Sequence, residues 1–379
     1  MQEFSRSEFT DTTRINAGRR MLHGLHIDLP LLFGLLMLVA VGIMVLYSAS
    51  EQDNKLVEQQ LLRLVIAFVV MFVVAQLSPD TLRHWSPWLF IIGLLMLIGV
   101  LLFGEHGKGA QRWLNLGLFT FQPSELMKLA LPMLLAWYLS EAQLPPKLKQ
   151  VSIVLLVILV PTILVAKQPD LGTALLLASS GIVVLFLAGL RWFYIILSFI
   201  LLIPASLALW FYGMHDYQRN RVLTFLNPES DPLGSGYHII QSSIAIGSGG
   251  LYGKGWLNGT QSHLDFLPER KTDFIFSAFS EEFGLIGAII LLFIYGAIIA
   301  RGLIIAAQAQ DTFSRLLAGS ITITFFIYVF INIGMVSGLL PVVGIPLPMV
   351  SYGGTSMVTL SAGFGILMSI QTHRKLIAS

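Results

Sequence analysis

Long apolar runs are the feature that most restricts how this chain can fold. A helix needs about 20 apolar residues to cross the hydrocarbon core of a bilayer. The runs do not alternate apolar and polar residues, as the strands of a membrane barrel would. The sequence therefore predicts an all-α integral membrane protein. Its ten transmembrane helices are expected near residues 29–49, 59–78, 86–103, 123–140, 151–167, 171–188, 192–213, 273–299, 315–336 and 355–370.

Lysine and arginine are unevenly distributed over the segments that join these runs. With the N-terminus in the cytoplasm, the cytoplasmic segments hold most of the basic residues, whereas the short outer loops hold few. This is the bias that membrane proteins show. We therefore expect both termini in the cytoplasm, and a large outer loop, about 214–272, between helices 7 and 8. Residues 1–24 are interpreted as a polar cytoplasmic tail, and residues 25–375 as one membrane domain.

The composition also excludes several kinds of protein. Only 12% of the residues are charged, and the net charge of +2 gives no indication of a nucleic-acid partner. The chain has no cysteine, which excludes disulfides and cysteine metal sites. The eight histidines show no metal-ligand spacing. The glycine-rich stretch 247–259 is not a nucleotide P-loop, because Lys254 is followed by Gly255 rather than by Ser or Thr.

Charged residues inside the apolar runs are candidate functional residues, because a charge in a bilayer is costly. In "FQPSELMKLALP", Glu125 and Lys128 are three residues apart and share one helix face. They form either a structural ion pair or a polar pocket that faces the bundle. Glu281 and Glu282 lie within the eighth run, and for at least one of them we favour a hydrogen bond between helices.

Two further clusters lie at the predicted outer face. In "VAKQPDLGTALL", Asp170 belongs to a polar turn between two runs. In "HLDFLPERKTDFIF", Asp273 stands where a charged segment becomes apolar. Asp273 is either the N-cap of the eighth helix, a role that aspartate fills well, or an acid–base group. Arg219 and Arg221 form a basic outer patch that simple snorkelling at the interface would also explain.

Several long motifs resemble the SEDS family (shape, elongation, division, sporulation) over nearly the whole chain. They are "GKGAQRWLNLGLFTFQPSELMKLALP", "AKQPDLGTALL", "GYHIIQSSIAIGSGGLYGKGWLNGTQSHLDFLPERKTDFIFSAFSEEFGLIG" and "GLLPVVGIPLPMVSYGGTS". The resemblance is strongest to the branch that serves side-wall elongation and rod shape. It implies a bacterial inner-membrane peptidoglycan glycosyltransferase that polymerises lipid II, with the large loop in the periplasm.

The resemblance also assigns roles to residues. It implies that Asp273 is the essential acidic residue and that Glu125, Lys128 and Asp170 belong to the site. Transfer from an α-linked pyrophosphate to a β-1,4 linkage inverts the anomeric carbon, which asks for one base. Positive charge or a metal should stabilise the leaving pyrophosphate. The residues expected to bind the substrate further include Arg112, Arg219, Arg221, Lys254, Lys271 and Arg270. No cofactor is certain, and a divalent cation (Mg or Mn) is an open alternative.

The implied partners are a class B penicillin-binding protein with transpeptidase activity and other proteins of the elongation complex, such as MreC and MreD. Two alternative functions stay open. One is a flippase that moves lipid II across the bilayer, and the other is a non-catalytic scaffold of the elongation complex. A flippase should need polar groups through the whole depth of the bilayer, whereas the strongest polar cluster here is predicted at the outer face.

Overall fold

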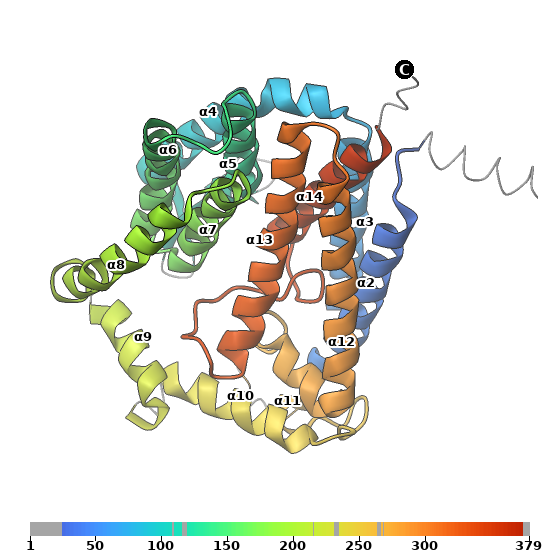
Figure 1. Ribbon diagram of the computed structural model, residues 1–379. Coiled ribbons are helices and arrows are strands. Elements are labelled where there is room, and N and C mark those ends of the chain that lie inside the picture. The colour runs from blue at the N-terminus through green and yellow to red at the C-terminus, as the bar shows by residue number, and fades with distance from the viewer. Residues whose placement is uncertain are drawn as a thin grey trace, which may run out of the picture.

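Helices dominate the computed structural model, which describes residues 25–107, 110–115, 120–214, 216–230, 235–263, 267 and 269–373. The expected tail 1–24 lies outside this part of the chain. The long helices stand side by side as a bundle (Figure 1). They are α2 (Leu29–Ala49), α3 (Asn54–Ala75), α4 (Pro79–Phe103), α5 (Pro123–Ser140), α6 (Leu148–Lys167), α7 (Leu171–Leu187), α8 (Trp192–Ala208), α12 (Ile275–Ala307), α13 (Thr312–Val336) and α14 (Thr355–Thr372).

Each of the predicted apolar runs is occupied by one of these helices. Six of them, α2, α3, α4, α6, α12 and α13, are long and apolar enough to cross a membrane. Some boundaries differ from the prediction. Helix α4 begins earlier than expected, because Ser78 caps it by accepting a hydrogen bond from the Thr81 backbone N–H, and Pro79 occupies its first turn.

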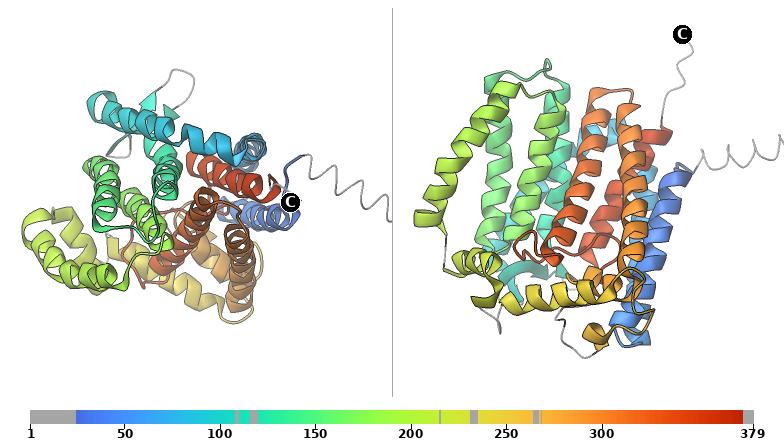
Figure 2. Two further views of the ribbon diagram at one scale, coloured as in Figure 1. Left: turned by 45° about the horizontal axis from the view of Figure 1, so that its top comes forward. Right: turned by 60° about the horizontal axis from the view of Figure 1, so that its bottom comes forward.

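The segment between α8 and α12 contains short helices. These are the π-helical turn η1 (Leu209–Gly213), α9 (Asp216–Leu226), the 3₁₀ turn η2 (Pro228–Ser230), α10 (Ser235–Gly249) and α11 (Thr260–His263). The views from two sides show α10 lying across the ends of the long helices, at the end of the bundle opposite the last turn of α14 (Figures 1 and 2).

A small antiparallel sheet joins α4 to α5 and was not predicted. Its strands are β1 (Glu105–Gly107), β2 (Ala110–Asn115) and β3 (Thr120–Phe121), in the order β1-β2-β3. Leu114 of β2 pairs with Phe121 of β3, which leads directly into α5. The sheet therefore brings Arg112 in β2 close to the first turn of α5.

Helix α12 is broken at Gly284, whose φ of 64° and ψ of −163° are not helical. A break in an apolar helix frees backbone groups that must find partners where water is absent. The glycine-rich segment 250–255 supplies these partners. The backbone N–H of Lys254 donates to the Glu281 carbonyl (3.0 Å), and the N–H of Leu285 donates to the Gly250 carbonyl (2.9 Å). The glycine-rich stretch thus supplies hydrogen-bond partners for backbone groups on both sides of the break.

The two adjacent glutamates beside this break have different partners. The Glu281 carboxylate accepts hydrogen bonds from Lys254 Nζ (2.7 Å), Thr260 Oγ1 (3.0 Å) and the Gln261 backbone N–H (2.9 Å). The Glu282 carboxylate accepts a hydrogen bond from the hydroxyl of Ser48 in α2. The expected hydrogen bond between helices is therefore confirmed for Glu282. Glu281 instead binds the segment between α10 and α12, through Lys254, Thr260 and Gln261.

We predict that Gly284→Ala destabilises the protein, because an added Cβ would lie 2.4 Å from the Gly253 backbone nitrogen and the positive φ disfavours any side chain. Backbone strain of this kind amounts to about 1–3 kcal/mol. The matched control is Gly296→Ala in the same helix, where an added Cβ meets nothing within 4 Å. Thermal unfolding in detergent should show a lower midpoint for Gly284→Ala only. Equal midpoints for the two variants would contradict the role of the break.

Candidate functional site

A cavity of about 560 Å³ gathers polar residues from segments that are far apart in the sequence. Its wall is formed by β2, the first turns of α5 and α7, the turn before α12 (269–274), and the loop between α13 and α14 (337–354). Of the residues predicted from the sequence, five line this cavity. They are Arg112, Glu125, Lys128, Asp170 and Asp273.

Glu125 and Lys128 form a buried ion pair on α5. Lys128 Nζ lies 2.7 Å from Glu125 Oε1, and the side chains are only 8% and 6% exposed. The ammonium group also lies 5.3 Å from the ring centroid of Tyr328 in α13, a cation–π distance. The two interpretations made from the sequence, an ion pair and a polar pocket, are compatible, because the two residues are paired and also line the cavity.

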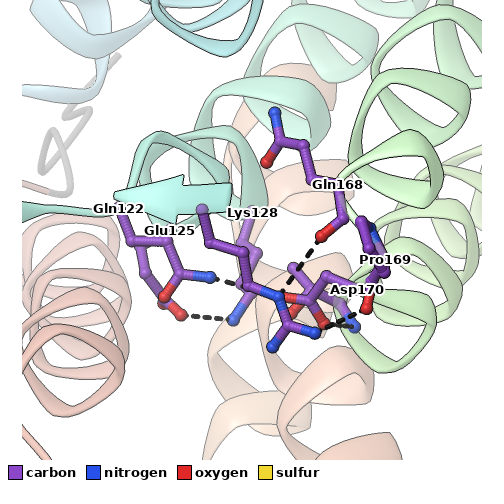
Figure 3. Close-up of polar contacts among 8 residues, drawn as sticks. Gln122, Glu125, Lys128, Gln168, Pro169 and Asp170 are labelled. Atoms are coloured by element: carbon purple, nitrogen blue, oxygen red, sulfur yellow. Dashed lines mark hydrogen bonds and ion pairs between the residues drawn. The ribbon is translucent and has the colours of Figure 1, made fainter. Parts of the chain in front are cut away.

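Asp170 is held from three directions at the start of α7. It is the N-cap of this helix and accepts a hydrogen bond from the Thr173 backbone N–H (3.2 Å). Gln122 Nε2 donates to Asp170 Oδ2 (3.3 Å), and Arg112 Nε lies 3.6 Å from the same oxygen. Figure 3 shows the first turn of α5 and the turn before α7 facing one another. Arg112 Nη2 also donates to the Pro169 carbonyl (2.5 Å). The arrangement fixes Arg112 at the cavity wall.

Asp273 lies in the turn before α12 and lines the cavity. The helix begins at Ile275, and its N-cap residue is Phe274, so the alternative that Asp273 caps this helix is wrong. A Cβ added to Gly344 would lie 3.4 Å from Asp273 Oδ2, which shows how closely the carboxylate approaches the loop between α13 and α14. A carboxylate at a cavity wall has the exposure that a proton acceptor requires.

His238 of α10 is a cavity residue that the sequence analysis did not select. Its ring stacks on Phe274, the residue after Asp273, with 5.7 Å between centroids. Burial lowers the pKa of His238 below the ordinary histidine value, although the nearby Glu269 carboxylate acts in the opposite direction. The lowered pKa favours the uncharged form of the His238 ring. The spacing of the histidines along the chain could not reveal this position, because the other cavity residues belong to distant segments.

Several basic residues expected to bind substrate are placed elsewhere. Arg219 donates to the carbonyls of Trp210 (3.0 Å) and Phe211 (3.2 Å) within η1, and Lys254 is paired with Glu281. Neither residue lines the cavity.

Two further predicted cations, Arg270 and Lys271, do not line the cavity. Arg270 forms an ion pair with Glu51 in the segment between α2 and α3. Lys271 contributes its backbone carbonyl to a contact with Tyr352 N–H (2.8 Å), but it does not line the cavity. Arg221 belongs to α9, and its side chain lies outside the described part of the structure.

Comparison with known proteins decides the family. The sequence profile of the FtsW/RodA/SpoVE family, described as cell cycle proteins, matches residues 21–376. This chain belongs to that family. An FtsW/RodA/SpoVE relative, peptidoglycan glycosyltransferase MrdB of Escherichia coli K12, is 54% identical over 93% of this chain and 95% of its own length. The SEDS resemblance found in the motifs is therefore confirmed.

Solved structures of the FtsW/RodA/SpoVE type share the fold. A chain solved in work on the structural coordination of polymerization and crosslinking by a peptidoglycan synthase complex has a TM-score of 0.81 and 33% identity, covering 92% of this chain and 99% of that one. The crystal structure of the rod shape determining protein RodA of Thermus thermophilus has a TM-score of 0.70 and 29% identity, covering 92% and 97%.

We predict that Glu125→Gln and Lys128→Met each destabilise the protein, because each leaves the other charge buried without its partner. Breaking a buried pair in this way costs about 3–5 kcal/mol. The double variant removes both charges and should recover most of the lost stability. Thermal unfolding of the three purified variants in the same detergent checks this. If the double variant is less stable than both single variants, the two charges do not depend on one another.

Proposed function

We propose that this protein is a peptidoglycan glycosyltransferase that polymerises lipid II into glycan strands for side-wall elongation and rod shape. The observation that carries the proposal is the cavity wall, where Asp273 from the turn before α12 shares one space with Glu125, Lys128, Asp170 and Arg112. The E. coli relative that matches nearly the whole chain is itself named a peptidoglycan glycosyltransferase.

The proposed reaction is a single displacement at the anomeric carbon of the donor sugar. The Asp273 carboxylate takes the proton from the 4-hydroxyl of the acceptor sugar, and that oxygen attacks the anomeric carbon. The bond from this carbon to the undecaprenyl pyrophosphate breaks, so a β-1,4 linkage forms with inversion. One carboxylate is enough, because the leaving pyrophosphate is stable once it is released.

The leaving group requires positive charge, which Lys128 and Arg112 supply at the same cavity. Each of these cations already has an acidic partner, Glu125 or Asp170. An ammonium has three N–H donors and a guanidinium has five, so both retain donors for phosphate oxygens. The acidic partners hold the cations in position when no substrate is bound.

The proposed topology has ten membrane crossings, with both termini in the cytoplasm and the large loop, about 214–272, in the periplasm. In support, the rings of His26 before α2 and His373 after α14 stack at 3.8 Å, so the domain begins and ends on one side of the bundle. The helices of the large loop lie at the opposite end (Figure 1). In this proposal residues 25–375 are one domain of a bacterial inner membrane, and residues 1–24 are a cytoplasmic tail.

A class B penicillin-binding protein is the proposed partner, with MreC and MreD as further members of the elongation complex. Support for the first comes from the solved relative that belongs to a peptidoglycan synthase complex. The flippase alternative is less well supported, because Glu281 and Glu282 are engaged by the loop 250–261 and by α2 rather than by the cavity. A non-catalytic scaffold would retain its function without the Asp273 carboxylate.

A divalent cation, Mg or Mn, would be held by the Asp273 carboxylate and would stabilise the negative charge of the leaving pyrophosphate. Within the described residues no three His, Asp or Glu side chains form a metal-binding group. Mg²⁺ is often held by one or two carboxylates together with substrate phosphates, so Asp273 and the substrate suit it.

We predict that a chelator stops polymerisation and that added Mg²⁺ or Mn²⁺ restores it. Full activity in chelator would exclude the cation, while leaving the role of Asp273 as base intact.

We predict that Asp273→Asn abolishes lipid II polymerisation in the absence of ATP, because asparagine cannot accept the hydroxyl proton. The assay measures glycan strands made by purified protein together with its transpeptidase partner. The matched control is Asp53→Asn at the exposed N-cap of α3, where asparagine caps as well as aspartate. The control should retain full activity. A normal glycan ladder from folded Asp273→Asn would refute the proposed function and favour a scaffold or a flippase.

A further inference from the structure

Asn332 of α13 is a polar side chain in an apolar helix, and it is completely buried. Polar residues inside membrane helices are costly and usually have a function. Its side-chain amide donates to the Asp273 carbonyl (2.9 Å) and to the Ile345 carbonyl (2.7 Å). Both partners are acceptors only, so the NH₂ group must face them. One side chain thus joins α13, the turn before α12, and the loop between α13 and α14.

Neighbouring contacts hold the same turn to the same loop. The carbonyls of Lys271, Thr272 and Asp273 are consecutive, and each accepts a hydrogen bond from α13 or from the loop that follows it. The donors to the first two are the Tyr352 backbone N–H (2.8 Å) and the Ser351 hydroxyl (2.6 Å). The third donor is Asn332. The main chain of the turn is therefore attached to the loop that lines the cavity.

We infer that Asn332 is a positioning residue, whose amide fixes the main chain of Asp273 to the loop between α13 and α14 and so sets where the Asp273 carboxylate stands in the cavity. The inference rests on the proposed function, because it gives Asp273 the role of base. Asn332 itself does not line the cavity, so its effect on the reaction passes through Asp273. The Asp273 carboxylate in turn faces Gly344, one residue before Ile345, the second residue that Asn332 holds.

The variant that tests this is Asn332→Leu, which removes the donor without opening a cavity. A displaced reacting group can lower a rate by about 100-fold, so we expect kcat for lipid II polymerisation to fall by about that factor. KM should stay unchanged, because the cavity residues that bind substrate are intact. The matched control is Thr322→Val in the same helix, which removes a buried hydroxyl that donates only to the Ala318 carbonyl (2.8 Å). The control should keep the wild-type kcat.

A double-variant cycle separates positioning from general structural damage. Asp273→Glu retains a carboxylate but moves it by one methylene. If Asn332 acts through the placement of Asp273, then Asn332→Leu together with Asp273→Glu loses less rate than the product of the single losses. Thr322→Val combined with Asp273→Glu should show independent effects. If Asn332→Leu does not fold, Asn332→Gln replaces it in the same cycle, since it retains an amide at a shifted position.

The outcomes distinguish the inference from the proposed function. A wild-type kcat for the folded Asn332 variant, or losses that multiply in the cycle, would overturn the positioning role while Asp273→Asn stays inactive. An active Asp273→Asn protein would instead remove the base on which the inference depends. A lowered kcat with unchanged KM and a non-multiplicative cycle supports the inference.

Discussion

An ionised side chain inside a bilayer must be paired or must face a space that holds water, and this constraint explains where the charges of the bundle lie. At one end, Arg301 of α12 binds Asp28, the N-cap of α2, with its Nε 3.1 Å from Asp28 Oδ1. Near the other end, Lys254 is paired with Glu281 beside the break in α12. Both pairs join segments that are distant in the sequence, and neither lines the large cavity.

The charges at the cavity follow the same constraint, but they also line a space that a ligand can enter. Glu125 neutralises Lys128, and Asp170 neutralises Arg112, yet all four line an open space large enough for part of a substrate. The cations retain donors for an anionic group, and the Asp273 carboxylate faces the same space. The acidic partners that make the buried charges tolerable therefore also hold them in position at the cavity.

Part of this arrangement could be predicted from the sequence. The apolar runs located the long helices, because a membrane helix has a characteristic length and hydropathy. The spacing of Glu125 and Lys128 predicted their pairing, since residues three apart share a helix face. The gathering of Asp273 with these two followed from the family resemblance rather than from spacing, because nothing in the local sequence relates a residue of the turn before α12 to the first turn of α5.

The features that were missed depend on contacts between distant segments. The break at Gly284 was not predicted, and only the packing of segment 250–255 shows why the helix breaks there. Lys254 was interpreted as a substrate ligand. Its pairing with Glu281 could not be seen from the sequence, because Glu281 belongs to another element. Asn332 was not selected, although one amide in an apolar run was a signal that could have found it. The role of Asn332 follows only from the structure, which shows the two carbonyls that accept its hydrogen bonds.

The position of the acceptor sugar relative to Asp273 tests the central claim most directly. An experimental structure of the Asp273→Asn variant with bound lipid II would show it. The account predicts that the 4-hydroxyl of the acceptor lies within hydrogen-bonding distance of the side chain at position 273, with the donor pyrophosphate near Lys128 and Arg112. A substrate bound with its reacting sugars remote from position 273 would contradict the account.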